Sequence, residues 1–354
     1  MRLTIERVSS PWILLSIPLF VAGVSLAPRS TGFHIALGLI GGFTLFCLAV
    51  VIPLYSSLVG GRPRGLGEWG LALGSYTTAL ISMLSGMAGL DPRPALALSM
   101  AFALAFTLAQ LRSSKVPLPR LYTLPTPFIL GLASLLVGNQ FWSLLAYGAW
   151  FSTTLVMVVG AVFLQNLYHR PGTRLHFVSI LIASLGLALY GIYSREVGLR
   201  LLALSLILHV MVMRPWEGVG GKRIGSDRGH LAQALGALAT LAASIIGVDD
   251  VSIAHMAMLG FAATGVYTQA PLLSPMIVSA TWRRKKWLGL SPLLMLGAAL
   301  ARVSSPHLSQ ALVIASVAVL LLELNPSPRR LYYIVRYGGE EGYLRSYYDA
   351  VKPT

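Results

Sequence analysis

The chain has 354 residues, of which 55% are hydrophobic and only 11% are charged. Soluble domains carry about 25% charged residues, so this composition excludes a soluble globular protein, because too few polar side chains are present to cover its surface. The net charge is +15, but the basic residues lie in short loops between apolar segments, where they orient membrane spans and meet lipid headgroups rather than nucleic acid. The single cysteine, Cys47, excludes a disulfide framework and a cysteine-based metal site.

Apolar segments long enough to cross a bilayer core of roughly 30 Å follow one another along the whole chain. The first could be read as a secretory signal, but Pro28 directly follows its small-residue end and disfavours cleavage, so we expect a membrane span there. In chain order, the twelve predicted spans cover residues 11–27, 33–58, 67–90, 94–111, 121–137, 141–167, 175–193, 196–213, 230–247, 250–280, 287–301 and 307–323.

The basic residues test this number of spans. With the N-terminus in the cytoplasm, 22 of the 27 Lys and Arg fall in cytoplasmic segments. Outer loops hold only Arg29, Arg93, Arg195 and Arg302, and Arg200 lies within the eighth span. A miscounted span would remove this bias, because every later loop would change side.

The sequence therefore predicts an all-α, multi-pass protein of the cell membrane with both termini in the cytoplasm. Residues 1–325 are predicted to form a twelve-helix transmembrane domain. Residues 326–354 are rich in Tyr and Arg, which is typical of a segment at the level of the lipid headgroups.

Ionisable side chains within the spans are the strongest pointers to function, because they are costly in lipid. All twelve carboxylates fall in loops or at span ends, which disfavours a proton- or sodium-coupled transporter. The remaining candidates are histidines. His34 and His255 lie at similar depth near the outer face, whereas His176 and His209 lie on successive spans near the inner face.

The positions of His34 and His255 suit the ligation of a haem. Neutral imidazoles that face each other from two helices can hold a haem iron, and small residues on the same helix faces, among them Gly38 and Gly260, would leave room for the macrocycle. The alternative is that the histidines have water or backbone partners at the interface and that the glycines serve close helix packing.

Two segments carry a resemblance to a known family. Gly32–Leu39 reads Gly-Phe-His-Ile-Ala-Leu-Gly-Leu, and Ile253–Phe261 reads Ile-Ala-His-Met-Ala-Met-Leu-Gly-Phe. They resemble the second and tenth spans of the haem-copper oxidase superfamily and, more closely, of the NnrS family. The resemblance implies a twelve-span bundle with a low-spin haem b near the outer face, held by His34 and His255. It also implies electron transfer or the handling of a diatomic such as nitric oxide.

Departures from the oxidase pattern limit what the resemblance implies. Oxidases carry copper-ligating histidines in the sixth and seventh spans, including an adjacent pair, whereas this chain has no His-His pair and only His176 near the inner end of the seventh span. An oxidase-type copper centre is therefore not expected. If the protein is an enzyme, the resemblance favours an oxidoreductase.

Further groups could serve the same cofactor chemistry. Arg29 and Arg302 could pair with haem propionates at the outer face, or contact lipid headgroups instead. His176 and His209 could hold a second haem near the inner face, with quinol or a redox protein as the electron partner. A homodimer is compatible with these expectations.

Two other functions remain open at the level of sequence. One is a transporter or channel for a small uncharged or anionic solute, without a cofactor and with incidental histidines. The other is a scaffold or assembly subunit of a respiratory complex.

Overall fold

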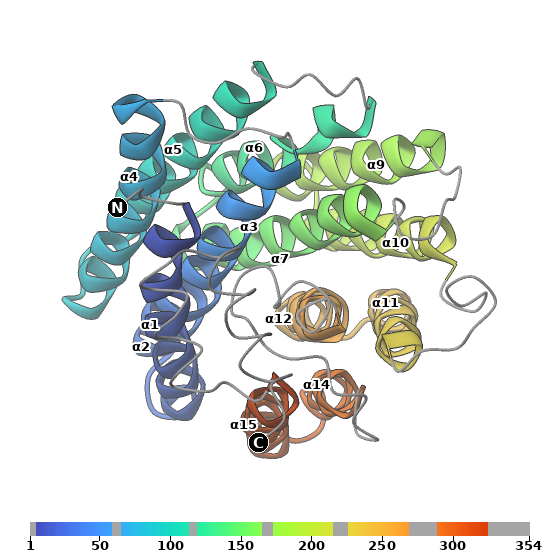
Figure 1. The fold of residues 1–354 in the computed structure, drawn as a ribbon. Helices are drawn as coiled ribbons and strands as arrows, with labels where there is room; N and C mark the ends of the chain where they lie inside the picture. Colours follow the sequence, from blue (N-terminus) through green and yellow to red (C-terminus); the bar gives the residue numbers. More distant parts are fainter. Residues whose placement is uncertain are drawn as a thin grey trace, which may run out of the picture. The chain divides into compact units, whose positions relative to one another are not determined.

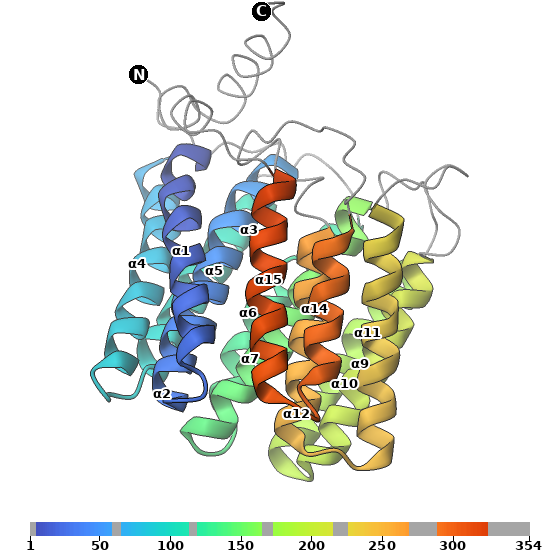
Figure 2. The same ribbon diagram turned by 90° about the horizontal axis from the view of Figure 1, so that it is seen from below.

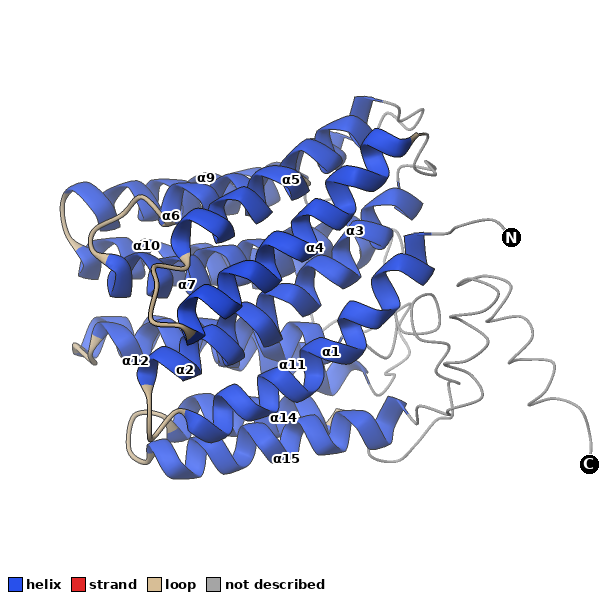
Figure 3. Ribbon diagram, turned by 90° about the vertical axis from the view of Figure 1, so that its left-hand side faces the viewer, coloured by secondary structure: helices blue, strands red, loops and turns tan. Residues whose placement is uncertain are grey.

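The fold of the chain is described by a computed structural model over residues 5–58, 65–112, 119–164, 173–214, 226–268 and 289–324. Throughout these ranges the chain forms helices joined by loops and turns, with no strand (Figure 3). The predicted interfacial tail over residues 326–354 lies outside the described residues. The chain divides into two compact units, which are treated separately below.

Unit 1 is Met1–Pro117, Gln269–Lys286 and Val317–Thr354. In this unit α2, η1 and α3 follow one another without a break, and α4 and α5 lie side by side (Figure 1). They are α1 (Ile5–Leu26), α2 (Thr31–Phe33), the π-helix η1 (His34–Thr44), α3 (Leu45–Leu58), α4 (Leu66–Met87) and α5 (Arg93–Arg112).

Unit 2 is Leu118–Thr268 and Trp287–Ser316, so α15 is divided between the two units. Within unit 2, α9 and α10 form an antiparallel hairpin, and α11 lies beside α10 (Figure 2). The elements are η2 (Pro119–Thr123), α6 (Thr126–Ser134), α7 (Gln140–Val159), η3 (Gly160–Leu164), α9 (Thr173–Ile192), α10 (Arg195–Met213), α11 (Ser226–Ile246), α12 (Asp250–His255), the π-helix η5 (Met256–Ala263), α14 (Leu290–Ala301) and α15 (Pro306–Leu324).

Helices long and apolar enough to cross a membrane coincide with eight of the predicted spans in the described residues. The fifth, eleventh and twelfth predicted spans contain shorter apolar helices, Leu121–Ser134, Leu290–Ala301 and Pro306–Leu322. The third predicted span is the helix α4, which is less apolar because of its serines, threonines and glycines. These helices are compatible with a multi-pass membrane protein.

Polar side chains within the helices bond to nearby backbone carbonyls. In α7 of unit 2, whose candidate span is buried throughout, Thr153 and Thr154 donate to the carbonyls of Ala149 and Trp150. The Trp150 indole donates across to α9, at 2.8 Å from the Ala183 oxygen. An unsatisfied polar group in hydrocarbon costs several kcal/mol, so these local bonds make a polar sequence compatible with an apolar surrounding.

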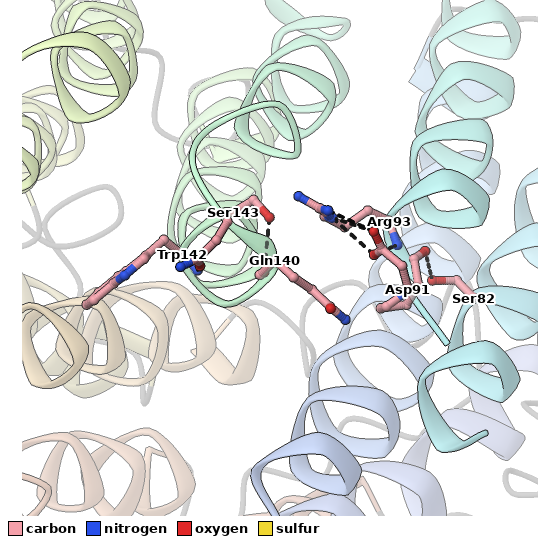
Figure 4. Close-up of polar contacts among 8 residues, drawn as sticks. Ser82, Asp91, Arg93, Gln140, Trp142 and Ser143 are labelled. Atoms are coloured by element: carbon pink, nitrogen blue, oxygen red, sulfur yellow. Dashed lines mark hydrogen bonds and ion pairs between the residues drawn. The ribbon is translucent and has the colours of Figure 1, made fainter. Parts of the chain in front are cut away.

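In unit 1, polar bonds of the same kind fix the turn between α4 and α5. The Ser82 hydroxyl donates to the Pro92 carbonyl at 2.7 Å. The Arg93 guanidinium forks onto the Asp91 carboxylate at 2.8–3.0 Å (Figure 4). These bonds from Arg93 hold the pKa of Asp91 below its ordinary value.

Glycines allow helix backbones to meet within each unit. A Cβ on Gly236 of α11 would fall on the carbonyl group of Gly260 in η5, and a Cβ on Gly42 of η1 would fall on the backbone of Phe20 in α1. Small residues that let backbones approach closely are the usual means of packing helices in membranes.

Gly236→Ala is expected to lower the stability of unit 2 by about 1–3 kcal/mol, because the added methyl must push α11 and η5 apart. The matched control is Gly70→Ala in α4, where a Cβ has no neighbour within 4 Å and the helix propensity rises. Thermal unfolding in detergent, followed by circular dichroism, compares the two variants. Equal midpoints would contradict this account of the packing.

Candidate functional site

His34, in unit 1, is the first residue of the π-helix η1. Its Nδ1 lies 3.1 Å from the Gly23 carbonyl oxygen of α1. A carbonyl oxygen only accepts, so Nδ1 is the donor and, in the neutral ring, the lone pair lies on Nε2. The imidazole is half-buried. This tautomer is the one a histidine needs in order to ligate a metal through Nε2.

The close approach of α1 and η1 depends on two glycines. A Cβ on Gly23 would fall on the backbone of Gly38, and a Cβ on Gly38 would lie 3.4 Å from His34 Nδ1. The missing side chains bring the Gly23 carbonyl within reach of the imidazole. Gly38 was expected to leave room for a macrocycle; in the described residues its neighbours are His34 itself and the α1 backbone, and its part in cofactor binding stays a prediction.

His255, in unit 2, is the last residue of α12, directly before the π-helix η5. Its Nδ1 donates to the Val251 carbonyl at 2.8 Å. The neutral ring therefore has the same tautomer as that of His34, with the lone pair on Nε2, and it is also half-buried. Each histidine thus stands where an α-helix widens into a π-helix, a change of winding that is frequent at functional sites.

Two carboxylates fix the beginning of α12. Asp249 caps the helix by accepting from the Ser252 N–H at 2.9 Å. Partial burial raises the pKa of Asp249, but hydrogen bonds from Ser252 and Val251 and attraction by Arg302 outweigh it and hold the pKa below its ordinary value. Asp250 pairs with Arg195 at 3.3 Å.

Arg195 has a second partner in the same unit. Its guanidinium carbon lies 3.9 Å from the centre of the Trp142 ring, which stands in the first turn of α7 (Figure 4). A guanidinium over an indole face is attracted by the ring quadrupole. Arg195 therefore contacts both the beginning of α12, through Asp250, and the beginning of α7, through Trp142.

The remaining predicted outer residues have structural neighbours of their own. A Cβ on Gly260 would lie 3.2 Å from the Ala299 Cβ and 3.4 Å from the Gly236 Cα, so this glycine serves helix contacts in unit 2. Arg302, the C-cap of α14, acts on Asp249. Arg29 follows α1 in a turn. Binding of haem propionates by Arg29 and Arg302 stays a prediction.

His176 and His209, which the sequence predicts to lie near the inner face, come together within unit 2. His176 of α9 is fully buried, His209 of α10 is 1% exposed, and their ring centroids are 6.5 Å apart. His176 Nε2 lies 3.2 Å from the Thr123 hydroxyl. The Phe261 ring lies edge-on to His209 at 5.8 Å, and His230 of α11 is near enough to interact with His209 electrostatically.

The buried polar atoms of this region that make no hydrogen bond include Nδ1 of His209 and Nε2 of Gln233. Leaving such a group unsatisfied costs about 1–3 kcal/mol. Gln233 was missed by the sequence reasoning, although its spacing of three from His230 on an apolar helix places both on one face. A Cβ on Gly265 would lie 2.6 Å from Gln233 Nε2, so a larger residue at this position would require the Gln233 amide to shift.

The structure thus brings His176 and His209 together in unit 2. In separate units, His34 and His255 each hydrogen-bond through Nδ1 to a backbone carbonyl, His34 on another helix and His255 on its own. In the ranges that the structure covers, no three His, Cys, Asp or Glu side chains form a group that could hold a metal ion. A haem iron needs only two protein ligands, so this finding does not bear on a haem site.

Comparisons with known proteins return no match for this chain among protein-family models, curated proteins or solved structures.

Asp249→Ala is expected to destabilise α12 by about 1 kcal/mol, because the Ser252 N–H loses its cap. Asp249→Ser keeps an acceptor and should retain most of the stability. Since the folded pKa of Asp249 is lowered, the contribution of the ionised cap is present above the unfolded pKa and is lost as the pH falls through the folded value. Thermal midpoints at neutral and acid pH test this. A midpoint difference between wild type and Asp249→Ser that does not change with acid would contradict it.

Proposed function

We propose that this chain is an integral membrane protein that binds haem b, with Nε2 of His34 and Nε2 of His255 as the axial ligands of the iron. The pairing of these two histidines on one haem comes from the sequence, in which both lie near the outer face at similar depth and in segments resembling the haem-binding spans of NnrS-like proteins.

The observation that carries the proposal is that both imidazoles make the same kind of hydrogen bond. In each, Nδ1–H donates to a backbone carbonyl, Gly23 for His34 and Val251 for His255. Metal-ligating histidines usually donate their second N–H in this way, which fixes the ring and raises the basicity of the ligating nitrogen. If His34 and His255 were merely interfacial residues, nothing would require both to have the same tautomer.

The proposed topology is the one predicted from the loop charges. Twelve spans cross the cell membrane with both termini in the cytoplasm, and the eight long apolar helices support a multi-pass arrangement. With this orientation, the haem between the second and tenth spans lies near the outer face.

Electron transfer is the role that two axial imidazoles favour. When both axial positions are filled, the iron is closed to gas ligands, and nitric oxide or another diatomic can bind only if one histidine leaves. The electron partner proposed from the sequence is quinol or a redox protein, and Arg29 and Arg302 are the proposed partners of the propionates.

His34→Ala and His255→Ala should each abolish the low-spin haem spectrum of the purified protein or convert it to a high-spin one. The wild type should be red, with a Soret band and split α and β bands after reduction with dithionite. The matched control is His307→Ala, which removes an exposed histidine at the beginning of α15 and should leave the spectrum unchanged.

Two results would overturn the proposal. A colourless wild type that takes up no added haem would exclude a haem protein and favour the transporter alternative. A low-spin spectrum that neither substitution changes in shape or intensity would move the axial ligands elsewhere.

A further inference from the structure

The rings of His176 and His209 are separated by a distance that one metal ion held between them would require. Their ring centroids are 6.5 Å apart and their planes meet at 62°. With metal–nitrogen bonds of about 2.0 Å, two imidazoles on opposite sides of one ion have centroids roughly 6.3 Å apart. A tetrahedral pair would lie closer together.

The hydrogen bonding of the ring nitrogens is also compatible with a metal between the two rings. The Thr123 hydroxyl lies 3.2 Å from His176 Nε2 and can accept a hydrogen bond from it or donate one to it. In the tautomer that donates Nε2–H, Nδ1 carries the lone pair that a metal takes. His209 Nδ1 is buried and has no hydrogen-bond partner. A metal at that nitrogen would supply the interaction that the protein itself leaves out.

Helix packing holds both side chains in place. α9 and α10 are packed as a hairpin, and a Cβ on Gly186 of α9 would lie 2.9 Å from the Gly198 carbonyl oxygen of α10, so the two backbones are in direct contact. The Phe261 ring of η5 lies edge-on to His209. Both imidazoles are therefore attached to closely packed helices of a single unit.

We propose that His176 and His209 bind one metal centre between them in a trans arrangement. In the described residues no group of three His, Cys, Asp or Glu side chains could complete a protein-only site, so the metal must be satisfied by two imidazoles. Two sources meet that requirement: the iron of a second haem, and a free transition-metal ion of low coordination number. This site lies in unit 2 and does not depend on the haem proposed at His34 and His255.

The test counts haem and metals per polypeptide in purified wild type, His176→Ala and His209→Ala. The pyridine haemochrome spectrum measures haem, and plasma mass spectrometry measures iron, copper and zinc. Each variant should lose about one equivalent of a single metal. Loss of iron together with haem identifies a second haem, and loss of a metal without haem identifies a free ion.

His230→Ala is the matched control, because it removes another buried histidine beside His209 and should keep the metal. Gel filtration and circular dichroism show whether each alanine variant folds. Where one does not, His209→Gln replaces the imidazole with a side chain of similar size, and it should also lose about one metal equivalent. Unchanged haem and metal contents in folded His209→Ala or His209→Gln would overturn the proposal, as would loss of the metal in His230→Ala alone.

Different results would overturn the haem proposed at His34 and His255 and the metal proposed at His176 and His209. Loss of the low-spin spectrum in His34→Ala and His255→Ala with no change in His209→Ala would leave only the outer haem. A wild type without haem that nevertheless loses one metal equivalent in His209→Ala would leave only the site at His176 and His209.

Discussion

Hydrogen-bond satisfaction in an apolar surrounding is the constraint on which the rest of the structure depends. A polar group in hydrocarbon has no water to replace a lost partner, so each side chain must find one nearby. Thr153 and Thr154 bond back to their own helix, and Trp150 reaches across to Ala183. The same requirement gives His34 and His255 their backbone acceptors and thereby fixes which nitrogen of each ring is left to act as a ligand.

The buried region around His209 is where this constraint is not met by the protein alone. In unit 2, the buried side-chain atoms without a hydrogen-bond partner include His209 Nδ1, Gln233 Nε2 and the Tyr190 hydroxyl. Native proteins rarely retain such groups without a reason. A ligand that reaches His209 would be one physical reason, and the spacing of His176 and His209 is compatible with the metal proposed between them.

Much of the architecture could be predicted from the sequence, because long apolar runs allow little except helices. All twelve predicted spans contain a helix in the described residues. The span over residues 67–90 shows the limit, because its polar residues make α4 less apolar than the others although it is a helix of 22 residues. The widening into π-helices at His34 and His255 had no sequence signal, since winding is set by tertiary packing.

The candidate sites were predictable in part. Histidines in apolar segments stand out by composition alone, and topology separates them into outer and inner pairs. Other features depend on which helices pack together, and a single sequence does not give this information. They are the Gly23 acceptor, the contact between Gly236 and Gly260, and the burial of Gln233. Arg302 illustrates the difference: the sequence suggested a propionate partner, and in the fold it acts on Asp249.

Electron paramagnetic resonance of the purified, oxidised protein tests the central claim most directly, because it reports the axial ligands of a ferric haem. Two imidazole ligands predict a low-spin ferric signal that disappears from its wild-type position when His34 or His255 is replaced. A purified protein that shows no ferric haem signal, or only a high-spin one, would contradict the assignment of His34 and His255 as the two axial ligands.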